Sequence, residues 1–307
     1  MKAHRTWRQV DGVLLLDKPR ELSSNAALQK VRHIFKAEKA GHTGTLDPLA
    51  TGLLPVCLGE ATKFSMGLLD ADKTYHATIQ LGQNTSTGDL EGEVIQTRSV
   101  NVNGLQIQET LNRFRGEILQ TPPMYSALKF QGKPLYEYIR QGQVIERPSR
   151  AVFIHELQLE SFNGQEMEIS VRCSKGTYIR TLGEDIGEAL GCGGFLTTLR
   201  RTSIADFKIT KAVTLSQLET MDDSQLFNQL LPVDCMLLHL PVVELNPEEF
   251  TRIIQGQRLR RADLSDGKVR LYFTGNFIGA GEVSHATLSP SRLLANSALF
   301  APSIQLT

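Results

Sequence analysis

The most unusual stretch of the chain is GHTGTLDPLATG, at residues 41–52. Its three glycines permit tight backbone geometry, and Pro48 biases Asp47 towards an extended conformation. A loop of this kind, following a helix, can project a carboxylate into a cleft. It is not a phosphate-binding P-loop, because no Gly-Lys-Ser/Thr ends it. An isolated Asp-Pro more often forms an Asx-turn that satisfies its own loop, so the rest of the chain must decide between a structural and a catalytic role.

Regular secondary structure is predicted on both sides of this loop. Residues 12–18 form an apolar run typical of a buried strand, and residues 25–36 repeat apolar side chains at helical spacing after a capping serine. Residues 73–81 alternate like a strand with one buried face, which includes Tyr75. Further elements are expected at 105–114 and 178–190 (helices) and at 152–159 and 167–173 (strands). Intermixed strands and helices without a βαβ repeat predict an α+β fold with a mixed, mainly antiparallel sheet.

The length of 307 residues allows about two domains. Pro232 and Pro241 lie in an acidic segment that resembles a join between domains. Beyond it, a short helix and brief strands at 269–273 and 277–283, punctuated by glycines, predict a small β-rich module. We therefore expect a main domain at 1–240, with an exposed excursion at 121–150, and a second domain at 241–307.

The formal net charge of zero conceals an uneven charge distribution. Residues 212–251 contain seven acids and no Lys or Arg, so the rest of the chain carries 33 basic against 26 acidic residues. A basic body can present a positive face to phosphates. The charge pattern therefore permits a nucleic-acid partner without specifying one.

Several classes of protein are disfavoured by composition. The four cysteines are scattered, with no CxxC or Cys/His cluster, which argues against a zinc site and against a disulfide framework. The apolar run near the N-terminus is too short for a signal sequence or a membrane span. We expect a cytoplasmic protein that has no membrane segment, metal or organic cofactor.

Several motifs, taken together, resemble those of the TruB family of tRNA pseudouridine synthases. Residues 41–52 are similar to the catalytic loop of that family. The other matching motifs are Lys18-Pro19, Tyr75, KGTYIR at 175–180, LRR at 199–201, and MYSALK at 124–129, which is similar to an RNA-gripping insertion. The resemblance spans residues 11–203 in order. It implies the pseudouridine synthase fold, with a C-terminal module similar to a PUA domain.

This resemblance implies a catalytic role for three residues. Asp47 is expected to be the essential carboxylate at the glycosidic bond, and Arg180 its partner, keeping it ionised and oriented. Tyr75 is expected to stack on the flipped uracil, a contact worth about 1–3 kcal/mol. Without the resemblance, Arg180 would more often be a surface ion pair and Tyr75 a core residue. The residues leave open whether Asp47 attacks C1′, attacks C6, or removes the C2′ proton.

Other residues are expected to bind the substrate. Tyr178 should line the base pocket, Leu199 should close it, and His42 should position the base or the RNA. The expected phosphate contacts are Lys18, Lys63, Lys129 and Arg140. The implied substrate is the T-loop uridine at position 55 of tRNA, reached by base flipping. The enzyme is expected to be a monomer with no obligatory protein partner.

One position departs from the family pattern. Glu21 stands where the first motif usually has glycine, two residues after Pro19. This position supports the catalytic loop, so a local backbone adjustment is expected there.

Three alternatives compete with this interpretation. A non-catalytic RNA-binding or tRNA-folding protein would be expected to lack Asp47, Arg180 or Tyr75, yet all three are present. The guide-RNA-dependent branch of the superfamily tends to carry longer basic tails, which this chain does not have. A hydrolase that used Asp47 would need a second carboxylate in a comparable motif, and none is found.

Overall fold

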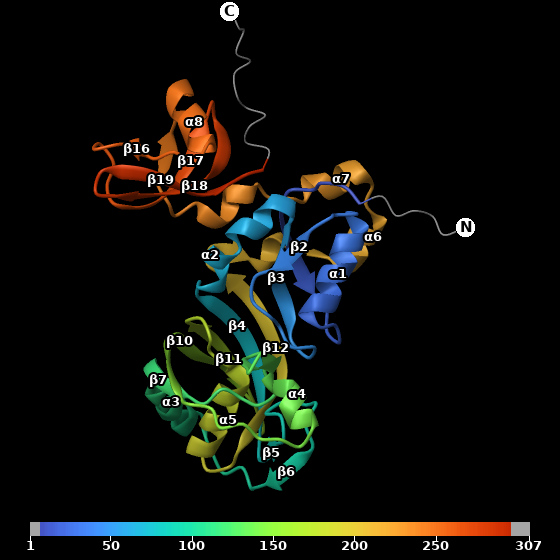
Figure 1. Ribbon diagram of the computed structural model, residues 1–307. Helices are drawn as coiled ribbons and strands as arrows, with labels where there is room; N and C mark the ends of the chain where they lie inside the picture. The colour runs from blue at the N-terminus through green and yellow to red at the C-terminus, as the bar shows by residue number, and fades with distance from the viewer. Residues whose placement is uncertain (1–6, 296–307) are drawn as a thin grey trace, which may run out of the picture.

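The computed structural model describes residues 7–295, whose main body is built on one ten-stranded sheet (Figure 1). The path through this sheet is β14 (Val213–Thr214), β1 (Gly12–Lys18), β3 (Thr51–Leu58), β12 (Gly194–Ile204), β4 (Lys73–Leu81), β11 (Glu166–Cys173), β10 (Arg150–Phe162) and β7 (Gly116–Gln120). Beside it, β2 (Ala40–His42) pairs with β3, and β13 (Phe207–Lys208) pairs with β12. Only the pairs β1–β14 and β3–β12 are parallel in this described sheet. The predicted α+β class with a mixed, mainly antiparallel sheet is confirmed.

The central strand β12 is not predicted by the sequence patterns. Its middle carries Thr197, Thr198, Arg200 and Arg201, which interrupt the apolar alternation of a core strand. Two of these polar residues have partners that only the fold supplies. Arg200 forms an ion pair with Asp17 of β1, and Arg201 is fully buried.

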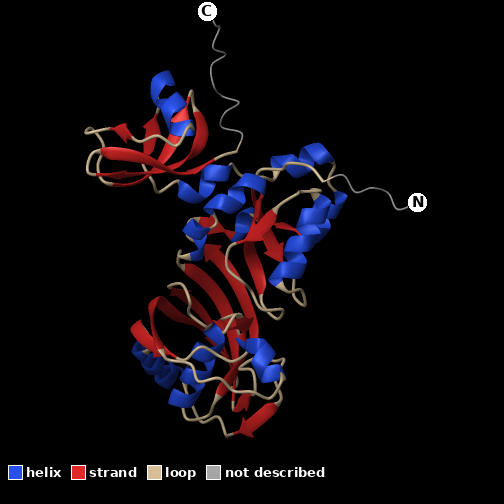
Figure 2. Ribbon diagram, viewed as in Figure 1, coloured by secondary structure: helices blue, strands red, loops and turns tan. Residues whose placement is uncertain are grey.

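Helices cover the sheet in two places (Figure 2). At one end, α3 (Gly104–Arg113) and α5 (Ile179–Ala189) pack on β4, β10 and β11. Residues 73–81 form a strand with the predicted alternation, and its buried face contributes Tyr75, Ala77, Ile79 and Leu81 to this core. At the other end, α1 (Ser24–Ile34), capped by the Ser23 side chain, packs on one face of β1 and β3.

Most of the acidic segment folds onto this main body. α6 (Leu215–Thr220) and α7 (Asp223–Asn228) each begin with a capping box, and Leu215, Leu218 and Leu226 join the core beneath α1. The 3₁₀ helix η3 (Val233–Leu237) packs on the other face of β1. The stretch that resembles a linker therefore covers the main body with a few buried side chains. Of its acids, Glu219, Asp222 and Asp223 are exposed, whereas Asp234 is buried and pairs with Arg270.

The C-terminal part forms a separate five-stranded sheet, at the upper left of Figure 1. Its elements are β15 (Val242–Glu244), α8 (Pro247–Ile254), β16 (Leu259–Arg260), β17 (Gly267–Phe273), β18 (Asn276–Ser284) and β19 (Thr287–Leu293). It contacts the main body through η1 (Gly59–Phe64), where the rings of Phe64 and Phe277 meet edge to face at 5.4 Å. Lys63 Nζ also donates to the Leu293 carbonyl at 2.9 Å.

The excursion at 121–150 contains more structure than one strand. It forms a short hairpin of β8 (Lys129–Phe130) and β9 (Lys133–Pro134), followed by α4 (Leu135–Arg140). Its last residue, Arg150, opens β10. The excursion leaves the sheet after β7 and returns at β10, and these two strands are neighbours. Both of its ends are therefore fixed to the same edge of the main sheet.

Candidate active site

The loop that carries Asp47 is held from two sides by the β1–α1 region. The buried Ser24 hydroxyl contacts both the amide of Leu46, at 2.7 Å, and its carbonyl, at 2.9 Å. The amide of Glu21 donates to the Pro48 carbonyl at 2.8 Å. The residues directly before and after Asp47 are thus fixed, and its side chain is left to point away from the loop.

Glu21 adopts the left-handed backbone conformation, with φ +68°. Glycine adopts this conformation more readily than residues with a Cβ. A residue with a Cβ is disfavoured in this conformation by about 1–2 kcal/mol. The bond from its amide to Pro48 helps to maintain the conformation, so some strain is placed directly behind the catalytic loop.

A second support for the loop comes from Arg201. Its guanidinium is buried and donates to the carbonyls of Leu53, at 2.8 Å, and Gly44, at 3.0 Å, and it also faces the hydroxyl of Tyr75. The backbone of Arg201 passes so close to Gly52 that a Cβ there would lie 2.3 Å from the Arg201 carbonyl oxygen. Glycine is therefore required at position 52, where the loop enters β3.

Asp47 and Arg180 meet as the sequence predicts. Asp47 Oδ2 lies 3.0 Å from Arg180 NH2, and Arg180 NH1 lies 3.4 Å from Oδ2 of Asp89, so the three side chains form an acid–arginine–acid row. Arg180 also donates to the carbonyls of Thr87 and Tyr125, at 3.1 and 2.6 Å. These contacts use both terminal nitrogens of the guanidinium, so its orientation towards Asp47 is fixed.

The Asp47 carboxylate lies on the floor of a cleft. Its side chain is 40% exposed, which leaves it within reach of a substrate, although protein surrounds it on most sides. Partial burial raises the pKa of the Asp47 carboxyl. The positive charges of Arg180 and Lys18 oppose this rise, whereas the negative charge of Asp89 adds to it. The carboxylate is thus held near a positive partner, while its partial burial disfavours the ionised form.

The cleft, of about 330 Å³, brings together residues from distant parts of the sequence. Asp47, Tyr75, Tyr178, Arg180 and Leu199 all border it. Tyr75 is 7% exposed, and burial raises the pKa of its hydroxyl, so it remains protonated at neutral pH. Two aromatic side chains and one leucine beside a single carboxylate can hold a planar base against a reactive group.

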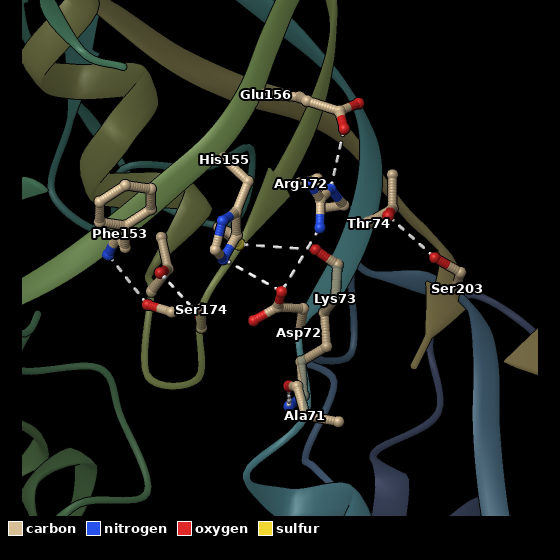
Figure 3. A network of polar contacts seen from close by, with 12 residues as sticks. Ala71, Asp72, Lys73, Thr74, Phe153, His155, Glu156, Arg172, Ser174 and Ser203 are labelled. Atoms are coloured by element: carbon tan, nitrogen blue, oxygen red, sulfur yellow. Dashed lines mark hydrogen bonds and ion pairs between the residues drawn. The ribbon is translucent and has the colours of Figure 1, made fainter. Parts of the chain in front are cut away.

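Lys73 also borders the cleft, although no sequence motif includes it. Its ammonium donates to the carbonyls of Leu69, at 3.1 Å, and Ala71, at 2.5 Å, and burial lowers its pKa to about 8. Figure 3 shows Lys73 at the start of β4, next to Asp72, which lies 3.0 Å from the His155 ring. Lys73 therefore closes the end of α2 (Met66–Leu69) beside the cleft.

The predicted phosphate contacts fall into two groups. Lys18 is fully buried, and its Nζ donates to the carbonyls of Pro19 and Leu22 at 2.9 and 2.6 Å, so it stabilises the turn beside the loop that carries Asp47. Lys63 forms an ion pair with Glu60 and donates a hydrogen bond to the Leu293 carbonyl of the C-terminal domain. Lys129 and Arg140 lie exposed on the excursion, where Arg140 stacks on Tyr136.

His42 lies on β2, two residues before Gly44, and is not among the described residues that line the cleft. Its Nδ1 is buried without a hydrogen-bond partner in the described structure. Burial and the nearby Arg201 lower its pKa, so the ring is neutral at physiological pH. A neutral histidine behind the loop can accept or donate a hydrogen bond but does not attract phosphate.

Sequence reasoning assigned no role to Asp89, Gln120 or Arg201. Asp89 lies in STGDLEG at 86–92, whose turn residues indicate only a loop. It is 2% exposed and reaches Arg180 because α5 packs beneath that loop. Gln120 is 1% exposed and bonds to the backbone of Tyr178. Nothing in the local sequence signals these partners, because each is more than 50 residues away from the group it contacts.

Within residues 7–295, no three His, Cys, Asp or Glu side chains are grouped to hold a metal ion. In the same range no helix is long and apolar enough to cross a membrane.

Three family models cover most of the chain. They describe the N-terminal domain of TruB family pseudouridylate synthases (residues 32–179), the C-terminal domain of tRNA pseudouridylate synthase B (180–238), and the C-terminal part of pseudouridine synthase II TruB (241–294). Curated relatives of the chain are named tRNA pseudouridine synthase B, and two of them show the degree of similarity. The one from Azoarcus sp. (strain BH72) is 56% identical over 94% of this chain and 96% of its own length, and the one from Dechloromonas aromatica (strain RCB) is 52% identical over 96% and 99%.

Solved structures share the fold at lower identity. A Cbf5-Nop10-Gar1 complex matches with a TM-score of 0.69 and 24% identity over 92% of this chain and 84% of that chain. An H/ACA RNP bound to a substrate RNA matches with a TM-score of 0.68 and 23% identity over the same shares. At this identity the likeness concerns the fold alone.

The fold is that of pseudouridine synthases, and the family model over residues 32–179 assigns the chain to that class of enzyme. The family models and the relatives make the assignment more specific: the chain belongs to the TruB family of tRNA pseudouridine synthases, enzymes that isomerise uridine to pseudouridine in tRNA.

Proposed function

We propose that the protein converts the T-loop uridine at position 55 of tRNA to pseudouridine, with Asp47 as the essential carboxylate. The observation that carries the proposal is the ion pair of Asp47 and Arg180 at the floor of a cleft lined by Tyr75, Tyr178 and Leu199. A base inside a folded loop reaches such a cleft only by flipping out of its stack. In the cleft, one tyrosine ring can stack on the flipped base and the other can present its edge to it.

The reaction exchanges one bond for another. The bond from N1 of uracil to C1′ breaks, the base turns, and C5 bonds to C1′; the proton from C5 leaves and N1 gains one. An ionised Asp47 could attack C1′, attack C6, or take the C2′ proton, and each route requires its negative charge. No water adds and no group departs, so one carboxylate is sufficient.

The binding groups follow from the same proposal. Lys129 and Arg140 lie exposed on the excursion and carry no ion pair in the described structure, so they are free to contact phosphates of the T-arm. His42 and Leu199 support the base site, His42 from behind the loop. Because one chain supplies every residue of the cleft, we propose that the monomer is active without a protein partner.

Pseudouridine mapping in tRNA from cells with and without the gene tests the substrate. Position 55 should carry pseudouridine only when the gene is present, and expression of the Asp47→Asn variant in the deleted strain should not restore it. Unchanged modification at position 55 in the deleted strain would refute the substrate assignment.

A further inference from the structure

Tyr178 is held by a buried amide that lies outside every motif. Gln120, at the end of β7, accepts the backbone N–H of Tyr178 at 3.0 Å and donates to its carbonyl at 3.2 Å. With the side chain only 1% exposed, this two-point contact is shielded from water. The backbone of Tyr178 is thereby fixed directly before α5, two residues ahead of Arg180.

The ring of Tyr178 is held by a second residue. The Arg150 guanidinium lies over the ring, 5.3 Å from its centroid, and also donates to the Gly176 carbonyl. Gly176 has φ +79°, and a Cβ at this position would lie 3.1 Å from Arg150 NH2. The guanidinium therefore occupies the space that a side chain at 176 would need, and it packs against both the loop and the ring.

These two residues are direct partners in the sheet. Arg150 pairs with Gln120 in the β7–β10 ladder, and this pair is the last before the excursion. One step further out, the hydroxyls of Thr121 and Ser149 lie 2.8 Å apart and join the two ends of the excursion. The excursion therefore begins and ends at the two residues that hold Tyr178.

We propose that Gln120 and Arg150 form a clamp that positions Tyr178 in the base cleft, at the point where the excursion leaves the sheet and rejoins it. The inference rests on the proposed function, which puts Tyr178 in the base pocket. Both are positioning residues, since they act through Tyr178. Because Arg180 follows two residues later on α5, displacement of Tyr178 also disturbs the partner of Asp47.

The position of Arg150 near the cleft allows a different role, direct contact with an RNA phosphate. A phosphate contact would act on binding, so its loss would raise KM and leave kcat unchanged. A positioning role acts on the geometry of the reacting complex, so its loss would lower kcat with little change in KM. Lysine retains the charge for a phosphate but lacks the planar group that covers the ring and bonds to Gly176 at the same time.

The test is a double-mutant cycle between Arg150→Met and Tyr178→Leu, with Arg150→Lys and Gln120→Met measured alongside. Tritium release from a T-stem-loop labelled at C5 gives kcat and KM, and thermal unfolding reports whether each variant is folded. Arg172→Met is the matched control. Arg172 is a partly exposed cation on β11, the strand next to β10, and it pairs with Glu156 and Asp72 (Figure 3). The register of β11 with β4 places it on the opposite face of the sheet from Tyr75.

The clamp predicts a fall in kcat of about tenfold for Arg150→Met and for Gln120→Met, with KM changed less than threefold and incomplete rescue by lysine. In the Tyr178→Leu background, Arg150→Met should change kcat less than twofold, because the ring it positions is absent. Arg172→Met should behave as wild type.

Three results would overturn the clamp while leaving the proposed function intact. They are a wild-type kcat in folded Arg150→Met, a rise in KM alone that lysine fully rescues, and the same tenfold loss in both Tyr178 backgrounds. Wild-type turnover by Tyr178→Leu itself would instead refute the role of Tyr178 in the base pocket, and the clamp with it.

Discussion

At the level of single residues, the site combines an accessible carboxylate with an immobilised guanidinium. Asp47 is reachable from the cleft, while Arg180 is immobilised by Asp89 and two backbone carbonyls. Because Asp89 is almost fully buried, its charge is weakly screened and adds to the rise in the pKa of Asp47. The activity should therefore fall on acidification at a pH above the ordinary carboxyl pKa of about 3.9.

Asp47→Asn should abolish turnover without preventing binding. The amide has nearly the same size and can remain beside Arg180, so folding and tRNA affinity should survive. The loss of negative charge should lower turnover by roughly 10⁴ or more, as for an interaction used in the transition state. Single-turnover tritium release from a T-stem-loop measures this effect. The turnover of Arg180→Lys should fall less than that of Asp47→Asn, because lysine keeps the positive charge. An Asn variant that retains a tenth of wild-type turnover would remove Asp47 from the chemistry.

At the scale of elements, the turn between β1 and α1 stores strain behind the catalytic loop. Glu21→Gly should raise the free energy of unfolding by about 1 kcal/mol, because glycine adopts φ +68° without a Cβ clash. Glu21→Ala is the matched control, since it removes the charge but keeps the Cβ, and it should leave stability unchanged within about 0.5 kcal/mol. Urea unfolding measures both. Equal gains in the free energy of unfolding for Glu21→Gly and Glu21→Ala would show that the loss of charge, and not the relief of backbone strain, causes the effect.

The helix α5 carries a second testable feature, Glu184. Burial, followed by the nearby Asp185, raises its pKa to about 7. The folded protein therefore binds a proton more tightly than the unfolded chain, so ionisation of Glu184 costs stability as pH rises from about 4.5 to about 7. Glu184→Gln should be more stable than wild type at pH 8 by about 1 kcal/mol, after allowance for partial exposure, and should lose this advantage at pH 4.

Glu188 on the same helix provides the control for this prediction. Arg98 donates to its carboxylate and lowers its pKa, so the charged form is favoured in the folded state. Glu188→Gln should therefore be less stable than wild type at pH 8, the opposite sign. Unfolding curves of both variants at pH 4 and pH 8 test this difference. If both substitutions changed the stability at pH 8 in the same direction, total charge and not local environment would control the pH dependence.

At the scale of the whole molecule, the C-terminal domain separates its cations into two groups. Arg258, Arg260 and Lys268 are exposed, whereas Arg261 pairs with Glu249 and Asp263, and Arg270 pairs with Asp234. Exposed, unpaired cations are the ones available to tRNA phosphates. The domain is packed against η1, so its position relative to the main body is fixed at this contact.

Replacement of Arg258, Arg260 and Lys268 by alanine should weaken binding of full tRNA and flatten its salt dependence. For each duplex phosphate that a cation no longer neutralises, the slope of log K against log salt should decrease by about 0.9. Turnover of an isolated T-stem-loop should not change, because the catalytic cleft is intact. Arg261→Ala is the control and should leave the slope unaltered. A triple variant with the wild-type slope on full tRNA would exclude these cations from the interface.

Features that depend on short-range patterns can be predicted from the sequence. Alternation at 73–81 predicted β4 with its bounds and its buried Tyr75. Helical spacing after Ser23 or Ser24 predicted α1, and the structure shows that Ser23 is the cap. β4 and α1 are encoded locally, because periodicity and capping act over a few residues. The pairing of Asp47 with Arg180 was instead implied by the resemblance of the loop at 41–52 and the motif at 175–180 to the TruB family, and the structure places the two side chains 3.0 Å apart.

The identity of the polar groups that are buried together depends on long-range packing. Lys18 has the sequence context of a phosphate ligand, yet it is enclosed by its own turn, and β12 lacks a strand pattern because its arginines find partners across the sheet. Asp89, Gln120 and Arg150 acquire their positions beside Arg180 and Tyr178 from packing between α5 and distant loops and strands. A buried polar side chain is stable only with a partner, and that partner is supplied by the fold and not by its neighbours in the chain.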